Sequence, residues 1–128
     1  VRRFVMAAQE NRVEEVVWGT GAPLREFLHV DDVANAVYFF LQNHNDPEVV
    51  NIGYGSDITI RELAGKIAEA AGFQGEISWD ASKPDGLYRK LMDSSKALKL
   101  GWKPQITLDQ GIARTVQEYR SRYSHFQK

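Results

Sequence analysis

Short apolar runs alternate with amphipathic segments along the whole chain, and single Gly or Pro residues separate them. A short apolar run bounded by turn residues indicates a strand, whereas apolar residues that recur every three or four positions indicate a helix. Strands that alternate with helices are typical of α/β proteins. No repeat, low-complexity tract or linker interrupts the pattern, so residues 1–128 are predicted to form one α/β domain.

Short strands are predicted in four places. They occupy residues 16–18, 26–30, 49–53 and 76–80. The first runs into Gly19-Thr20-Gly21-Ala22-Pro23, which a helix cannot cross because proline lacks the backbone N–H that a helix uses. The fourth is followed by Pro84-Asp85-Gly86, a sequence that favours a tight turn.

Helices are predicted between these strands and at both ends of the chain. They lie near residues 2–9, 31–43, 60–71, 95–100 and 108–123. Two of them begin with a capping box, in which two side chains satisfy backbone N–H groups that would otherwise be free: Thr59-x-x-Glu62 and Thr107-x-x-Gln110. Gly72 is the expected left-handed stop of the third helix.

The second helix carries an acidic pair at its start. Asp31 or Asp32 is predicted to cap it, and its inner face is expected to hold Val33, Val37, Phe40 and Leu41. Adjacent acidic residues at a helix start are commonly a cap and a favourable dipole contact, so this pair is not interpreted as catalytic. His29 is expected to be half-buried in the preceding strand, and Ser124 to Lys128 are expected to fray.

Composition excludes several classes of partner and chemistry. Sixteen Lys and Arg residues against seventeen Asp and Glu residues give a net charge of -1, so no global field favours nucleic acid or an anionic membrane. No apolar run is long enough to span a membrane, and no secretory pattern opens the chain, so the protein is expected to be soluble and cytoplasmic. The absence of cysteine excludes disulfides and thiolate chemistry within these residues.

The motifs of a complete dehydrogenase are missing from these residues. Gly19-x-Gly21 and Gly53-x-Gly55 each lack the third glycine of a dinucleotide fingerprint, so both are interpreted as turns. No tyrosine is followed by a lysine four residues later, and the three histidines have no H-x-x-x-H spacing, so neither a Tyr/Lys proton-donor pair nor a metal site is predicted. Together with a first residue that is not Met and a first helix that has no cap, these absences suggest a piece of a longer protein.

Basic and aromatic residues gather instead where predicted elements end. They are Arg3, Trp18, Arg25 and the segment Lys83-Pro84-Asp85-Gly86-x-x-Arg89-Lys90. Loops at strand ends carry ligands in α/β folds. An Arg fork matches phosphate oxygens, a Lys adds a point charge, and a Trp offers a flat apolar face. Such a set suits a nucleoside diphosphate, although each residue taken alone would more often be a solvated charge or a core aromatic.

These residues fall in motifs that resemble a known family. The motifs are Trp18-Gly19-x-Gly21-x-Pro23, Arg25-Glu26-Phe27-x-x-Val30-Asp31-Asp32, Asn51-x-Gly53 and Ser82-Lys83-Pro84-Asp85-Gly86-x-x-Arg89-Lys90. They resemble the C-terminal part of the GDP-L-fucose synthases, which are extended short-chain dehydrogenase/reductases with a Rossmann-like fold. The second and third motifs are shared across that superfamily, whereas the first and fourth are more particular to the GDP-fucose enzymes. Leu87-Tyr88 departs from the family, which usually has Thr-Pro there.

The resemblance implies a role for this chain. The family epimerises GDP-4-keto-6-deoxymannose at C3 and C5 and reduces C4 with NADPH to give GDP-L-fucose. Its catalytic residues and its cofactor loop would precede Val1, in a Rossmann domain that this chain lacks, so the fragment alone is expected to be inactive. Its substrate-binding positions match Arg3, Trp18, Arg25, Lys90 and Asp85, and the full-length protein is expected to be a homodimer.

Two other interpretations remain open. The chain could be part of another sugar-nucleotide epimerase or dehydratase that shares the skeleton and reads a different base. It could also be a non-catalytic module that binds a nucleotide sugar. The reading frame upstream of Val1 separates a module from an enzyme, since only an enzyme would carry the glycine-rich loop and Tyr-x-x-x-Lys there.

Overall fold

The computed structural model describes residues 1–123, so the expected frayed tail at 124–128 lies outside the described residues. The helices are α1 (Arg2–Gln9), α2 (Val30–Asn43), α3 (Ile60–Ala70), α4 (Ser95–Lys99) and α5 (Leu108–Tyr123). The strands are β1 (Glu14–Trp18), β2 (Leu24–Glu26), β3 (Asp57–Thr59), β4 (Glu76–Asp80) and β5 (Arg89–Lys90). This mixture of helices and short strands confirms the predicted α/β class. None of the helices within residues 1–123 has the length and apolar character needed to cross a membrane.

Local signals in the sequence set several element ends correctly. The capping box at Thr59 is complete, because the Thr59 side chain accepts from the Glu62 N–H and the Glu62 carboxylate accepts from the Thr59 N–H. The box at Thr107 and Gln110 forms in the same way. Gly72 follows the end of α3 with a φ of +64°, as expected for a left-handed stop.

Two predicted strands are wrong. The second lies at Leu24–Glu26 and shares only Glu26 with the predicted range 26–30, because residues 27–29 are irregular and Val30 already begins α2. Residues 49–53 form no strand, since no other segment within residues 1–123 pairs with them. Two short strands that the sequence did not suggest, β3 and β5, flank β2 instead.

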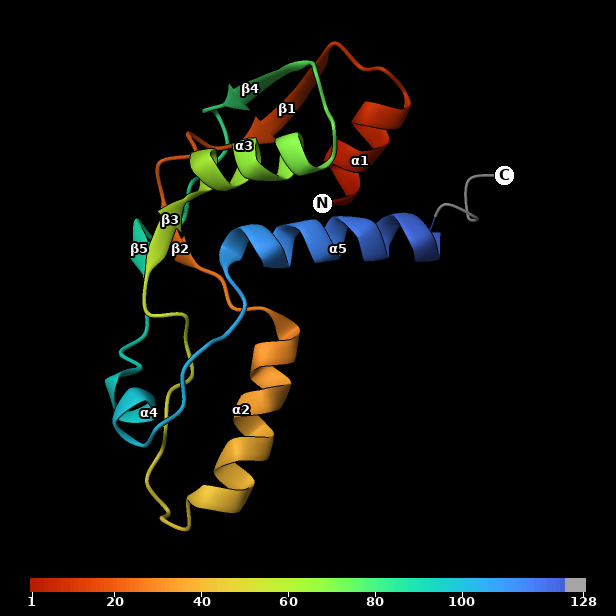
Figure 1. Ribbon diagram of the computed structural model, residues 1–128. Coiled ribbons are helices and arrows are strands. Elements are labelled where there is room, and N and C mark those ends of the chain that lie inside the picture. The colour runs from red at the N-terminus through yellow and green to blue at the C-terminus, as the bar shows by residue number, and fades with distance from the viewer. Residues whose placement is uncertain (124–128) are drawn as a thin grey trace.

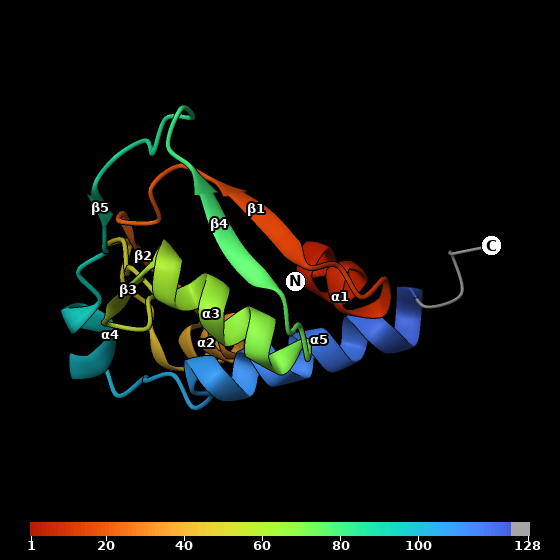
Figure 2. The ribbon, with the colours of Figure 1, turned by 90° about the horizontal axis from the view of Figure 1, so that it is seen from above.

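The described strands form two small sheets. β1 pairs with β4 in parallel, from Glu14 opposite Glu76 to Trp18 opposite Asp80. In the other sheet β2 lies in the middle, antiparallel to β3 and parallel to β5. Figure 2 shows β1 and β4 side by side with their arrowheads at the same end, so the loops that follow both strands leave from one edge.

The main core joins α1, α3 and α5 beneath the β1–β4 sheet. Its buried residues are Phe4, Val5, Ala7, Ala64, Ala68, Ala71, Phe73, Ile112 and Val116. Ile77 and Trp79 of β4 pack against this cluster from the sheet. Figure 1 shows these elements together at one end of the molecule. The small alanine side chains of α3 let the helices approach closely, and Phe4 and Phe73 fill the space with rings 5.7 Å apart.

A smaller cluster joins α2 and α4 at the other end (Figure 1). It is built on Ala36, Ala97 and Trp102, and the buried indole N–H of Trp102 donates to the Asn35 side chain at 3.1 Å. The predicted inner face of α2 is therefore wrong in part. Phe40 packs on the cluster, but Val33, Val37 and Leu41 are 38%, 51% and 80% exposed, because nothing within residues 1–123 covers that side of the helix.

The start of α2 differs from the prediction as well. His29, half-buried as expected, caps the helix by accepting from the Asp31 N–H at 3.2 Å. Asp32 is buried, and its two carboxylate oxygens accept from the backbone N–H groups of Gln105 and Ile106, each at 3.0 Å. Asp32 thus fastens α2 to the segment that leads into α5, and so joins the two ends of the molecule.

Candidate functional site

The residues that the sequence singled out lie mostly around two loops, residues 19–23 and 81–88. Because β1 and β4 are parallel, these loops leave the same edge of their sheet, the position where α/β proteins commonly bind ligands. The first loop leads into β2 and the second into β5, and these two strands pair with each other. The two loops therefore begin after one pair of neighbouring strands, β1 and β4, and end at another, β2 and β5 (Figure 2).

A double hydrogen bond joins the loops across their middle. The backbone N–H and the hydroxyl of Thr20 donate to the two carboxylate oxygens of Asp85, at 2.7 and 2.6 Å. The hydroxyl bond and then the backbone bond stabilise the charged carboxylate, and so they hold the pKa of Asp85 below its usual value of 3.8. Asp85 is therefore ionised at neutral pH and directed toward Thr20.

The glycines beside Thr20 allow this close approach. Gly19 and Gly21 have φ values of +84° and +76°, which disfavour other residues. A Cβ on Gly19 would lie 2.3 Å from an Asp85 oxygen, and one on Gly21 would lie 2.6 Å from the Trp79 ring. The interpretation of Gly19-x-Gly21 as a turn rather than a dinucleotide fingerprint fits these conformations.

Arg25 and Lys90 are the cations that the structure places together. They are register partners in the parallel pair β2–β5, so their side chains leave the same face of the sheet. The Arg25 guanidinium donates to the carbonyl oxygens of Leu24 and Leu87, both at 2.7 Å, which uses two of its five N–H donors. Lys90 is exposed. The pair can present two positive charges and several donors to one anion.

The strands that carry this pair are fixed from both sides. Arg89 in β5 forms an ion pair with Asp57 in β3 at 2.5 Å, which reaches across the central strand β2. This contact lowers the pKa of Asp57 and raises that of Arg89, the side-chain hydrogen bond being the largest cause in each case. Glu26 in β2 accepts from the Gly55 N–H at 2.7 Å, and a Cβ on Gly53 would lie 2.6 Å from its carboxylate. These contacts hold Arg25 and Lys90 in register.

Trp18 ends β1 immediately before the first loop. Its side chain is 69% exposed, which is unusual for an indole that serves only the core. The Lys83 ammonium lies 5.8 Å from the centre of the Trp18 ring. Trp18, Lys83 and Asp85 thus lie along the two joined loops, whereas Arg25 and Lys90 lie in the strands of the second sheet into which these loops lead.

Arg3 lies apart from these loops, at the start of α1. It donates to the buried carboxylate of Glu15 at 2.6 Å and to the Val16 carbonyl oxygen. Glu15 is also paired with Arg12 at 3.1 Å, so this buried acid is satisfied by two arginines. Arg3 therefore has a structural partner in β1, and 56% of its side chain remains exposed to solvent.

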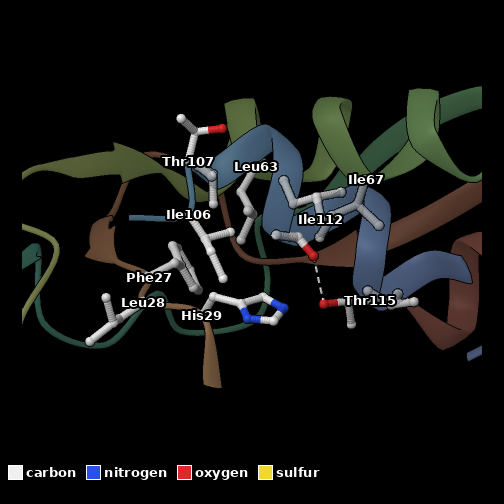
Figure 3. Close-up of a pocket in the computed structure, with 12 residues that line it drawn as sticks. Phe27, Leu28, His29, Leu63, Ile67, Ile106, Thr107, Ile112 and Thr115 are labelled. Atoms are coloured by element: carbon white, nitrogen blue, oxygen red, sulfur yellow. Dashed lines mark hydrogen bonds between the residues drawn. The ribbon is translucent and has the colours of Figure 1, made fainter. Parts of the chain in front are cut away.

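A mostly apolar cavity lies elsewhere, where the two ends of the molecule meet. It has a volume of about 210 Å³ and is lined by residues of α3, α5 and the segment 27–29. Figure 3 shows His29 and Phe27 facing Ile112 and Thr115 across it, with the Thr115 hydroxyl bonded to a carbonyl of its own helix. Its lining contains no Lys or Arg, so it does not suit a diphosphate. No group of His, Asp or Glu side chains within residues 1–123 is placed to hold a metal ion.

Three residues that hold the first loop in place had no role predicted from the sequence. Thr20, Arg61 and Trp79 all occur in the sequence runs discussed above, yet nothing marked them as contacts. Arg61 donates to the Thr20 carbonyl oxygen at 2.5 Å and stacks 4.5 Å from the Trp79 ring centre. The available signal was the glycine on each side of Thr20, since paired glycines indicate that other groups approach the backbone.

Comparisons with known proteins show which proteins this chain is similar to. Residues 1–53 match the family model described as "NAD dependent epimerase/dehydratase family". The chain is 55% identical over 119 residues to "Probable GDP-L-fucose synthase 1" of Oryza sativa subsp. japonica, which covers 93% of this chain and 36% of that protein. The chain thus spans little more than a third of that relative.

Solved structures give the same result. A GDP-L-fucose synthetase from Naegleria fowleri bound to NADP superposes with a TM-score of 0.89 at 29% identity, covering 96% of this chain and 39% of that one. A GDP-mannoheptose C4 reductase from Campylobacter jejuni with NADP bound has a TM-score of 0.81 at 34% identity, covering 93% and 42%. The resemblance inferred from the motifs is therefore confirmed, and it extends over nearly the whole chain.

Proposed function

We propose, from its relation to the GDP-L-fucose synthases over nearly its whole length, that this chain is the GDP-sugar-binding portion of a longer enzyme. That enzyme would be an NADPH-dependent 3,5-epimerase and 4-reductase, which converts GDP-4-keto-6-deoxy-D-mannose to GDP-L-fucose. In this proposal residues 1–128 form its C-terminal, substrate-binding domain. A cofactor-binding Rossmann domain would precede them.

The observation that carries the proposal is the Arg25–Lys90 pair. Two cations on neighbouring strands, on the same face of the sheet, match the charge of a diphosphate. Arg25 is held by two carbonyl oxygens and is therefore oriented before a ligand arrives, which reduces the entropy lost on binding. Each charge-assisted bond is worth roughly 1.5–3 kcal/mol, so the pair supplies a substantial share of GDP affinity.

The other predicted binding residues take different roles. Trp18 offers its exposed ring to the nucleotide or the sugar. Asp85 belongs to the site by fastening the loop that leads to Lys90, since both of its oxygens already accept from Thr20. Arg3 would act from the start of α1, with the donors that Glu15 and Val16 leave free.

Catalysis and cofactor binding fall to the rest of the enzyme in this proposal. The glycine turns of this chain do not fit a dinucleotide, because Asp85 and Trp79 occupy the space beside Gly19 and Gly21 that a pyrophosphate would need. The contribution of this chain is to hold the remote nucleotide. That binding energy keeps the keto sugar in register with the reacting groups, so it affects turnover as well as affinity.

Turnover by the full-length protein tests the proposal. With GDP-4-keto-6-deoxymannose and NADPH, we expect NADPH oxidation and formation of GDP-L-fucose, whereas residues 1–128 alone are expected to be inactive. Calorimetry with GDP, UDP and dTDP should show preference for GDP. A protein that binds UDP or dTDP at least as tightly would contradict the proposal and favour another sugar-nucleotide epimerase.

A second candidate within this class is reduction of a different GDP-sugar. The likeness to a GDP-mannoheptose C4 reductase favours it specifically. It would keep the Arg25–Lys90 pair and change the sugar. Consumption of a 4-keto heptose in place of the 6-deoxy sugar would support it.

A homodimeric, cytoplasmic full-length protein is part of the main proposal, and the molar mass in solution tests the dimer.

A further inference from the structure

The loop of residues 19–23 is also held from the side of helix α3. Helix α3 begins directly beside it, and the first two free N–H groups of the helix donate to the loop. Ile60 N donates to the Pro23 carbonyl oxygen and Arg61 N to the Gly21 carbonyl oxygen, both at 2.9 Å. The loop thus takes the place of water at a helix start, where backbone donors need partners.

The Arg61 side chain adds a second fixed point. Its guanidinium donates to the Thr20 carbonyl oxygen at 2.5 Å and lies 4.5 Å from the centre of the Trp79 ring. Trp79 itself packs against the main core. Arg61 therefore connects the core to the middle of the loop through one stacked contact and one hydrogen bond.

Thr20 passes this restraint to the second loop. While its carbonyl is held by Arg61, its N–H and hydroxyl donate to Asp85, and the hydroxyl also accepts from the Ala22 N–H at 3.1 Å. Asp85 lies in the loop that offers the Leu87 carbonyl to Arg25. A continuous series of contacts thus runs from the core through Arg61, Thr20 and Asp85 to the Arg25–Lys90 pair.

We propose that Arg61 is a positioning residue for the nucleotide site: through Thr20 and Asp85 it holds the two loops in the arrangement that lets Trp18, Arg25 and Lys90 reach one ligand. The inference rests on the proposed function for the identity of that ligand. Arg61 itself does not touch the nucleotide. Its effect is on the order of the loops before binding, which lowers the cost of forming the complex.

The chemistry of the contact requires an arginine. A planar guanidinium can stack on an indole and donate in its own plane at the same time, whereas a lysine ammonium is a point charge on a flexible stem. Arg61→Lys should therefore retain the hydrogen bond to the Thr20 carbonyl oxygen only in part. Thr20→Ser keeps the hydroxyl that meets Asp85, and Thr20→Val removes it at nearly the same volume.

The test uses the full-length protein with Arg61→Ala, Arg61→Lys and the control Lys66→Ala. Lys66 lies in α3, like Arg61, and its substitution removes an exposed ion pair with Asp109 of α5. Hydrogen exchange followed by mass spectrometry reports on residues 19–23 and 81–90, and calorimetry with GDP reports affinity. In Arg61→Ala we expect faster exchange in both loops and a Kd for GDP raised about five- to tenfold, which is less than the roughly tenfold or more expected for loss of a charge-assisted bond to the ligand itself, because Arg61 acts only through the loops. KM for the GDP-sugar should rise with it while kcat stays within about twofold.

The remaining variants sharpen the test. Arg61→Lys should fall between Arg61→Ala and the unsubstituted protein, Thr20→Val should resemble Arg61→Ala, and Thr20→Ser and Lys66→Ala should change neither readout. Unchanged loop exchange in both Arg61→Ala and Thr20→Val would overturn the inference, as would faster exchange with an unchanged Kd. If the unsubstituted protein binds no GDP, the proposed function fails instead, and exchange alone then decides whether Arg61 orders the loops.

Discussion

The two ends of this molecule are built differently. Around α1, α3 and α5 the apolar faces meet one another, and nine buried residues form a continuous core. Around α2 and α4 only three apolar residues are buried within the described part of the chain, and the apolar stripe of α2 faces outward. An amphipathic pattern therefore predicts that a helix has an apolar face, but it does not predict that residues of the same stretch of sequence cover that face.

The site belongs to the well-packed end. Its loops are fastened through Arg61 to Trp79, which packs on the main core, whereas α2 is joined to that core through the Asp32 carboxylate. Substitutions at the two ends should therefore lower the free energy of unfolding by different amounts. A chain in which both ends responded equally would contradict this description.

The largest effect is expected in the main core. Phe73→Ala leaves a cavity beside Phe4 and should lower the free energy of unfolding by about 3–5 kcal/mol. Urea unfolding of the 128-residue chain, followed by circular dichroism, measures this loss. A loss below about 1 kcal/mol would mean that the cluster is not packed as described.

An intermediate effect is expected where the two ends join. Asp32→Ala leaves the backbone N–H groups of Gln105 and Ile106 without their acceptor and should cost about 2–3 kcal/mol. Asp31→Ala is the matched control, because Asp31 is exposed and its contacts with His29 and Arg114 are long, at 3.6 and 3.8 Å. Equal losses for the two variants in the same unfolding experiment would refute the role given to Asp32.

A small effect is expected on the outer stripe of α2. Leu41 is 80% exposed, so Leu41→Ala should change the free energy of unfolding of the chain by less than about 0.5 kcal/mol. The same measurement applies. A loss comparable with that of Phe73→Ala would show that the stripe is buried after all and would remove the contrast between the two ends.

The pH dependence that Asp57 and Asp85 contribute to stability should be confined to acid. The pKa of Asp85 and that of Asp57 are lowered by bonds from Thr20 and Arg89, so their stabilising effect is complete above about pH 4. It is lost as the pH falls through the lowered pKa values. Thermal unfolding between pH 8 and 3 should therefore show no contribution from these groups until the lower end, and Asp85→Asn should flatten part of the acid decline. A decline that Asp85→Asn left unaltered would contradict the bridge to Thr20.

What the sequence predicted well was local. Thr59 and Glu62 are three residues apart, so a capping box can be read without knowing the rest of the fold. Strands β3 and β5 were missed because they are three and two residues long, contain polar residues such as Asp57 and Lys90, and exist only through pairing with β2. Short strands of this kind depend on their partners rather than on their own pattern.

The site shows the same division. Arg25 and Lys90 could be found from their charge and from the motifs that contain them, and the structure pairs them as register partners. The bond between Thr20 and Asp85 spans 65 residues, and no spacing rule connects positions so far apart. Arg3 was grouped with the other cations by its charge and by the family resemblance, and the structure pairs it with the buried carboxylate of Glu15.

The central claim is that Arg25 and Lys90 bind a diphosphate, and calorimetry of the full-length protein with GDP and GMP tests it most directly. The unsubstituted protein should bind GDP more tightly than GMP, and Arg25→Ala should weaken GDP binding about tenfold or more while it removes most of that preference. Lys103→Ala, which removes an exposed lysine outside the site, should leave both affinities unchanged. An Arg25→Ala protein that kept its affinity for GDP and its preference over GMP would contradict the claim.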